Sequence, residues 1–134
     1  MKVYNESINL KTSRGISFID MTEKITDVVN NSKVDNGMLF IFAPHATGAI
    51  IINEYENHLL EDIKKFLEKL VPPNELYRHP ENAPSHILSS FLRPSVSVPL
   101  TQGRLQLGTW QSIIWVEVEP WQRNRNVYVT IIGE

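Results

Sequence analysis

The stretch Met38-Leu39-Phe40-Ile41-Phe42-Ala43, followed after four residues by Gly48-Ala49-Ile50-Ile51-Ile52-Asn53, decides the fold. Each run is apolar along most of its length and too short for a free-standing helix, so each predicts a buried strand. The residues between them, Pro44-His45-Ala46-Thr47, are few enough for a hairpin or a tight bend. The centre of the chain is therefore predicted to be sheet, with His45 at the end of a buried strand.

Helical periods lie on both sides of this centre. An apolar stripe begins after Glu54 and runs until Pro72-Pro73 stops it, which predicts a long amphipathic helix. Asp20 stands three residues before Glu23, a capping arrangement that predicts a helix closing at residues 30–32. Asn82 is suited to cap a third helix that ends near Leu92.

The remaining apolar pattern is that of strands. Alternation predicts strands at 3–10 and 96–100, with a turn at 101–103, and residues 110–119 and 126–132 are two further, long strand candidates. We therefore expect one compact α+β domain over residues 1–134. Its predicted architecture is a largely antiparallel β-sandwich or barrel-like sheet, with two to three helices packed against it.

Composition excludes several classes of protein. A net charge of −2 argues against a nucleic-acid partner, which needs a basic face. No apolar run is long enough to cross a membrane, and the first residues lack the apolar core of a signal peptide, so we expect a cytoplasmic protein without a membrane partner. With no cysteine, a transition metal must bind to His, Asp or Glu. No motif indicates an organic cofactor.

Three segments concentrate chemically useful side chains. They are residues 44–54 with His45 and Glu54, residues 77–86 with His79 and His86, and the glycine-threaded residues 103–111. Each also has a purely structural interpretation, because single histidines are more often hydrogen-bonded structural residues than ligands. The glycines of the third segment can equally be turn or bulge formers.

The order and spacing of these groups resemble the YjbQ family over almost the whole chain. The matching motifs are His45-x-Thr47, Asn53-Glu54, Tyr77-x-His79, Asn82-Ala83 with Ser85-His86-Ile87, Gly103-x-Leu105-x-Leu107-Gly108-Thr109-Trp110-Gln111, and Arg123-x-Arg125. The resemblance implies a homotrimer whose histidines gather in one cavity. It also implies an activity like that of secondary thiamine-phosphate synthases, some family members being assigned to that class.

This resemblance assigns roles to particular residues. His45, His79 and His86 would form a metal site, since three imidazoles suit Zn²⁺ and leave a fourth position for water or substrate. A hydrogen-bonded histidine cluster that binds an anion is the alternative. Mg²⁺ would serve instead with a diphosphate substrate. The catalytic candidates are Glu54, Glu81 and Thr47, and the substrate-binding candidates are Asn53, Asn82, Arg104, Thr109, Trp110, Gln111, Arg123 and Arg125.

Three departures from the family pattern separate the two functional hypotheses. The family commonly has a second Thr where Ala46 stands, a Gly where Arg93-Pro94 ends the third helix, and an Asp where Asn57 stands. An Asn can serve neither as a general base nor as an anionic ligand. The first hypothesis is an enzyme acting on a phosphorylated small molecule. The alternative is a non-catalytic homotrimer that binds a small ligand or a metal.

Overall fold

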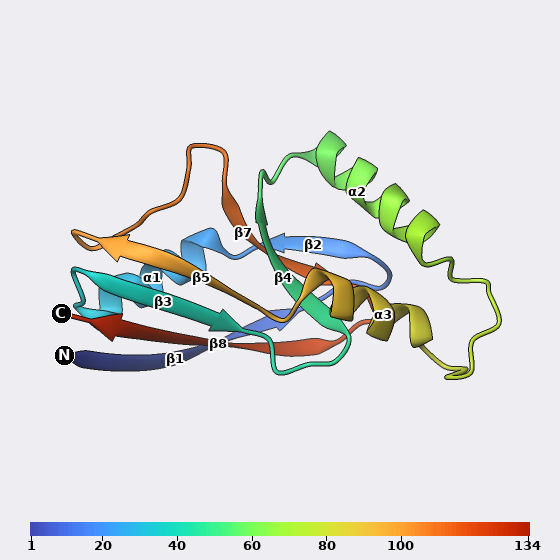
Figure 1. Ribbon diagram of the computed structural model, residues 1–134, viewed down its shortest axis with the longest axis horizontal. Helices are drawn as coiled ribbons and strands as arrows, with labels where there is room; N and C mark the ends of the chain where they lie inside the picture. The colour runs from blue at the N-terminus through green and yellow to red at the C-terminus, as the bar shows by residue number, and fades with distance from the viewer.

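The computed structural model describes all residues, 1–134, as two antiparallel sheets and three helices (Figure 1). This confirms the predicted α+β class. The elements are β1 (Lys2–Lys11), β2 (Ser17–Asp20), α1 (Thr22–Ser32), β3 (Gly37–Phe42), β4 (Gly48–Asn53), α2 (Asn57–Leu70), α3 (Ala83–Leu92), β5 (Ser95–Thr101), β6 (Arg104–Leu105), β7 (Ser112–Glu117) and β8 (Asn124–Gly133).

The two apolar runs at the centre of the chain belong to different sheets. β3 lies in a five-stranded sheet of order β1-β8-β3-β5-β6, whereas β4 is an edge strand of the sheet β2-β7-β4. The connection 43–47 therefore carries the chain from one sheet to the other instead of closing a hairpin. Of the two predicted conformations, the bend is the one observed.

The core fills two layers on either side of β7. Ile113 and Trp115 face the five-stranded sheet and pack in a cluster with Ile41 and Val129, alongside residues of α1. The alternate residues Ile114 and Val116 face outward to α2 and α3. Because β7 is covered on both faces, it reads as a continuous apolar run and not as an alternating one.

The starts of α1 and α2 differ from their predictions, whereas α3 begins directly after Asn82 as predicted. Asp20 Oδ1 accepts from the backbone N–H of Thr22, but the residue before α1 makes no side-chain cap, so the predicted pairing with Glu23 does not form. α2 begins at Asn57, and the side chain of Glu56 caps it. Glu54 therefore precedes that helix instead of lying in its first turn. None of the three helices has the length and apolarity needed to cross a membrane.

Candidate functional site

Two of the predicted histidines meet at the start of α3. The rings of His79 and His86 lie with centroids 5.0 Å apart and planes at 85°. Both line an open hollow of about 340 Å³, which we call the histidine hollow. Its walls are Tyr77, Arg78, His79, Ala83, His86 and Ile87. Arg78 adds a fixed positive charge beside two imidazoles, an arrangement suited to an anion.

One nitrogen of His79 is engaged within the chain. His79 Nε2 lies 3.0 Å from Asn82 Oδ1, and Asn82 Nδ2 donates to Glu119 Oε1 at 2.8 Å. Glu119 is buried, with 1% of its surface exposed. Asn82 occupies the predicted cap position of α3, but its side chain makes no cap hydrogen bond. Its amide instead joins the buried carboxylate to the imidazole.

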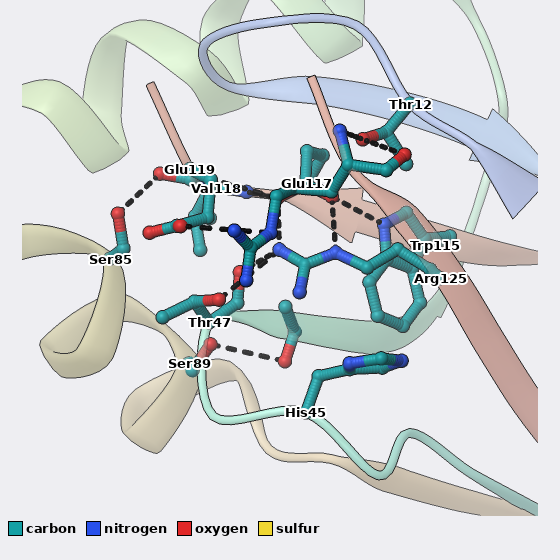
Figure 2. Close-up of polar contacts among 12 residues, drawn as sticks. Thr12, His45, Thr47, Ser85, Ser89, Trp115, Glu117, Val118, Glu119 and Arg125 are labelled. Carbon is teal, nitrogen blue, oxygen red and sulfur yellow. Dashed lines mark hydrogen bonds and ion pairs between the residues drawn. The ribbon is translucent and has the colours of Figure 1, made fainter. Parts of the chain in front are cut away.

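Arg125 of β8 and Glu117 of β7 form a buried ion pair (Figure 2). Arg125 donates to Glu117 from Nε at 2.8 Å and from Nη2 at 2.6 Å. Nη2 also donates to the carbonyl and hydroxyl oxygens of Thr47, at 2.9 and 3.2 Å. The guanidinium lies 5.6 Å from the ring centroid of Trp115. Arg125 and Thr47, predicted to bind substrate and to catalyse, are thus buried in a structural network.

The hydrogen-bond partners of Glu117 favour its charged form. Burial alone would raise its pKa, but the bond from Arg125, the backbone N–H of Glu119 and the charge of Arg125 together lower the pKa below its ordinary value. Because Glu117 accepts from the backbone N–H of Glu119 at 3.0 Å, the ion pair also helps to place that second carboxylate.

His45 is half-buried and packs against the buried network, and it does not line the histidine hollow. Its Nε2 accepts from the backbone N–H of Asn126 at 3.0 Å, and its ring packs edge-on to Trp115 with centroids 6.0 Å apart. Partial burial, and then the charge of Arg125, lower the pKa of His45. Because Nε2 also lies 3.2 Å from the Asn126 carbonyl oxygen, the backbone of Asn126 engages this nitrogen in either tautomer.

The motif around Asn53 and Glu54 lies at the far end of β4. Ser89 of α3 donates to the Gly48 carbonyl, so α3 contacts the start of this strand. Six extended residues then span about 20 Å to Glu54. The backbone N–H of Glu54 donates to the Asn53 side chain, and neither side chain makes another hydrogen bond.

The third motif is also distant from α3. Thr109, Trp110 and Gln111 are exposed in the loop between β6 and β7 (Figure 1), and 72% of the Trp110 surface is accessible. Arg104 lies on β6, against α1. In a single chain no three His, Cys, Asp or Glu side chains are arranged to hold a metal ion. The expected convergence of three imidazoles does not occur within one chain.

A second cavity, of about 310 Å³, adjoins the histidine hollow and shares Tyr77 with it. Its walls include Asn82 and the carboxylates of Glu68, Glu75 and Glu81, but no lysine or arginine. We call it the acidic cavity. Glu81, a predicted catalytic residue, is therefore near the histidines. The absence of basic groups makes the cavity itself unsuitable for a phosphate.

Sequence reasoning missed three residues of this region. Arg78 stands directly before His79, so its proximity was available from the chain order. Glu117 interrupts the apolar run of 113–118 and Glu119 follows it directly, and a charge within a buried strand is rare unless it is paired. That interruption was the available signal for the buried network.

Comparisons with known proteins identify the family and its fold. The family described as "UPF0047 protein YjbQ-like" matches residues 6–134. A UPF0047 protein of Methanothermobacter thermautotrophicus is 41% identical, over 100% of this chain and 95% of its own. Salmonella typhimurium YjbQ is 35% identical, over 98% and 99%. The crystal structure of a protein from Sulfolobus solfataricus, 34% identical, covers 99% of each chain with a TM-score of 0.96. One from Clostridium acetobutylicum, 38% identical, covers 95% of this chain and 99% of its own with a TM-score of 0.90. The chain belongs to the YjbQ (UPF0047) family.

Proposed function

We propose that this protein is a small-molecule enzyme that acts on a phosphorylated substrate at the histidine hollow. The observation that carries the proposal is the placement of Arg78, His79 and His86 around one open hollow. A guanidinium can hold a phosphate through two parallel hydrogen bonds. An adjacent imidazole can transfer a proton near neutral pH. Transfer chemistry of the thiamine-phosphate-synthase type is the reaction that the family resemblance suggests.

The neighbouring acidic cavity indicates where the rest of the substrate would lie. Its wall combines carboxylates with the apolar side chains of Val71, Leu88 and Val118. Such a cavity suits an apolar or cationic organic group better than a second phosphate. The phosphate would therefore bind beside Arg78, and the organic part would extend past Tyr77 into the acidic cavity.

The same side chains support a metal site less directly than a phosphate site. Two imidazoles are one ligand short of the three protein ligands typical of a catalytic zinc site. The predicted Zn²⁺ would need a further ligand from another copy of the chain. Mg²⁺ would arrive with a diphosphate substrate, since proteins commonly hold it through substrate phosphates and one or two carboxylates.

We further propose that the protein acts as a homotrimer. The outer face of the five-stranded sheet carries Met38, Phe40, Phe42 and Tyr128, all exposed and adjacent across β3 and β8. An apolar surface of this kind commonly marks a subunit interface. Assembly could also bring the Trp110 loop and Glu54 of one copy toward the hollow of another.

The second candidate function is a non-catalytic homotrimer that binds a small ligand or a metal. Asn57 favours it, because this residue stands where relatives commonly carry an Asp and cannot act as a general base. The two candidates predict the same ligand in the hollow. They differ in whether that ligand is turned over.

Calorimetric titration with inorganic pyrophosphate tests the proposal. We expect binding to the wild-type protein and at least a tenfold loss of affinity in Arg78→Ala and in His86→Ala. Lys65→Ala is the matched control, because it removes a cation from the exposed face of α2. Equal affinity in all four proteins would contradict a site at the hollow. Incubation with a pyrimidine diphosphate and a thiazole phosphate, followed by pyrophosphate release, separates the enzyme from the binding protein.

A further inference from the structure

We propose that Glu119 is a positioning residue, which acts through Asn82 to hold His79 in the tautomer with its proton on Nε2. The role of this tautomer in catalysis rests on the proposed function, whereas the tautomer itself is a property of the protein without substrate. With its proton on Nε2, His79 has its free lone pair on Nδ1. No group of the chain hydrogen-bonds that nitrogen, so it is available to a substrate proton.

The orientation of the Asn82 amide follows from what a carboxylate can do. A carboxylate only accepts hydrogen bonds, so the amide NH₂ must face Glu119 Oε1, which lies 2.8 Å away. The reversed amide would bring two oxygens to that distance without a proton between them. With the NH₂ so placed, Asn82 Oδ1 faces His79 Nε2 at 3.0 Å, and Nε2 must donate.

Glu119 is in turn held from inside the molecule. Its backbone N–H donates to Glu117 Oε2, and Glu117 is fixed by two hydrogen bonds from Arg125. A continuous series of polar contacts therefore runs from the buried ion pair to the exposed imidazole. Supporting groups of this kind commonly fix the ring orientation and tautomer of a functional histidine.

The cap of α3 supplies an independent observation. An asparagine at a helix N-cap normally accepts a hydrogen bond from a backbone N–H of the first turn, which stabilises the helix. Asn82 occupies this position, yet its side chain makes no such bond. Its amide joins Glu119 to His79 instead, so this helix forgoes its usual cap in favour of the imidazole.

This arrangement has a consequence for proton transfer. When His79 takes a proton at Nδ1, its bond from Nε2 to Asn82 persists, and the new positive charge lies near a buried carboxylate. The ring can thus accept a proton without reorganising its support. His86, 5.0 Å away by ring centroid, has no comparable side-chain partner, so His79 is assigned the proton-transfer role.

Nitrogen NMR of ¹⁵N-histidine-labelled protein tests the inference, because the chemical shifts separate a protonated ring nitrogen from one with a lone pair. His79→Gln assigns the resonance among the four histidines. In wild-type protein at pH 8 we expect Nε2 protonated and Nδ1 bare. In Glu119→Met, which preserves side-chain volume, both shifts should move toward values that average the two tautomers. Asn82→Ala, at a less buried position, should do the same if the first variant fails to fold.

Glu75→Gln is the control, since it removes a carboxylate from the acidic cavity without touching this series of contacts. Unchanged His79 shifts in Asn82→Ala or in a folded Glu119→Met, or equal changes in Glu75→Gln, would overturn the inference. Pyrophosphate binding distinguishes the two proposals. A fixed tautomer without pyrophosphate binding contradicts the proposed function alone, and binding at the hollow without a fixed tautomer contradicts this inference alone.

Discussion

Replacing Arg125 with methionine should destabilise the protein strongly, although Arg125 is buried and does not line the histidine hollow. Arg125 is 2% exposed, and its partner Glu117 is fully buried. Methionine fills much of the same volume but leaves Glu117 as a buried charge without its cation. Removing one partner of a buried ion pair typically costs about 3–5 kcal/mol of unfolding free energy.

The size of the chain converts this cost into a melting temperature. Unfolding entropy near 60 °C is about 2.1 cal/mol/K per residue, which for 134 residues is about 0.28 kcal/mol/K. Arg125→Met should therefore lower the melting temperature by roughly 11–18 °C. Differential scanning calorimetry at one fixed protein concentration measures this, since assembly would make the transition depend on concentration.

Two further variants make the reasoning refutable. Arg123→Met is the same substitution two residues earlier, where the side chain is half exposed and lies 3.9 Å from Glu119, so it should cost less than about 1 kcal/mol. The double variant Arg125→Met with Glu117→Gln removes the stranded charge and should recover part of the loss. If Arg125→Met and Arg123→Met have the same melting temperature, or if the double variant melts no higher than Arg125→Met, the buried ion pair does not contribute the stability assigned to it.

Three other outcomes are expected. Burial and the charge of Arg125 lower the folded-state pKa of His45, so the contribution of His45 to stability is complete above the unfolded pKa of about 6.5 and declines as the pH falls below it. The urea midpoint of His45→Gln should therefore fall less between pH 7.5 and pH 5.5 than the midpoint of the wild type. Equal falls in the two proteins would contradict this. Light scattering at micromolar concentration should give a trimer mass for wild-type protein and a smaller mass for Phe40→Asp, which charges a side chain that is 44% exposed; a monomeric wild type would end the assembly proposal. Glu54→Gln should reduce turnover roughly 10²–10⁴-fold if Glu54 transfers a proton in the assembled enzyme, with an unchanged melting temperature because its side chain makes no hydrogen bond; an unchanged rate would remove Glu54 from the mechanism.

Local pattern was sufficient to predict most of the elements. The alternation of residues 3–10 predicts β1, the strand candidate at 126–132 corresponds to β8, and the apolar stripe after Glu54 predicts α2. The short strand β2 was missed because its four residues carry no period that a window can detect. The crossing at 43–47 was also beyond local reasoning, since so short a link can serve either conformation and long-range pairing decides between them.

The candidate site was predictable only in part, because residue type does not reveal burial. Spacing and resemblance assigned His45 and Arg125 to ligand binding, and the structure employs both in the buried network. His79, His86 and Asn82 do come together, because they lie within eight consecutive residues and the start of α3 orients them. A short sequence separation is what made this part of the site accessible to prediction.

Some of the candidate residues are buried in the structural network and others line the histidine hollow, and this difference narrows the set of residues to test for function. The roles of Thr47, Glu117 and Arg125 are accounted for by folding, since they satisfy one another inside the protein. Folding gives no comparable reason for an arginine beside an exposed and a half-buried histidine, or for an asparagine that forgoes its helix cap. Natural proteins tolerate such local costs mainly at functional sites. The exposed Trp110 is a second feature that folding of one chain does not explain. A shared site, in which the hollow of one copy meets the tryptophan loop of another, would account for both features together.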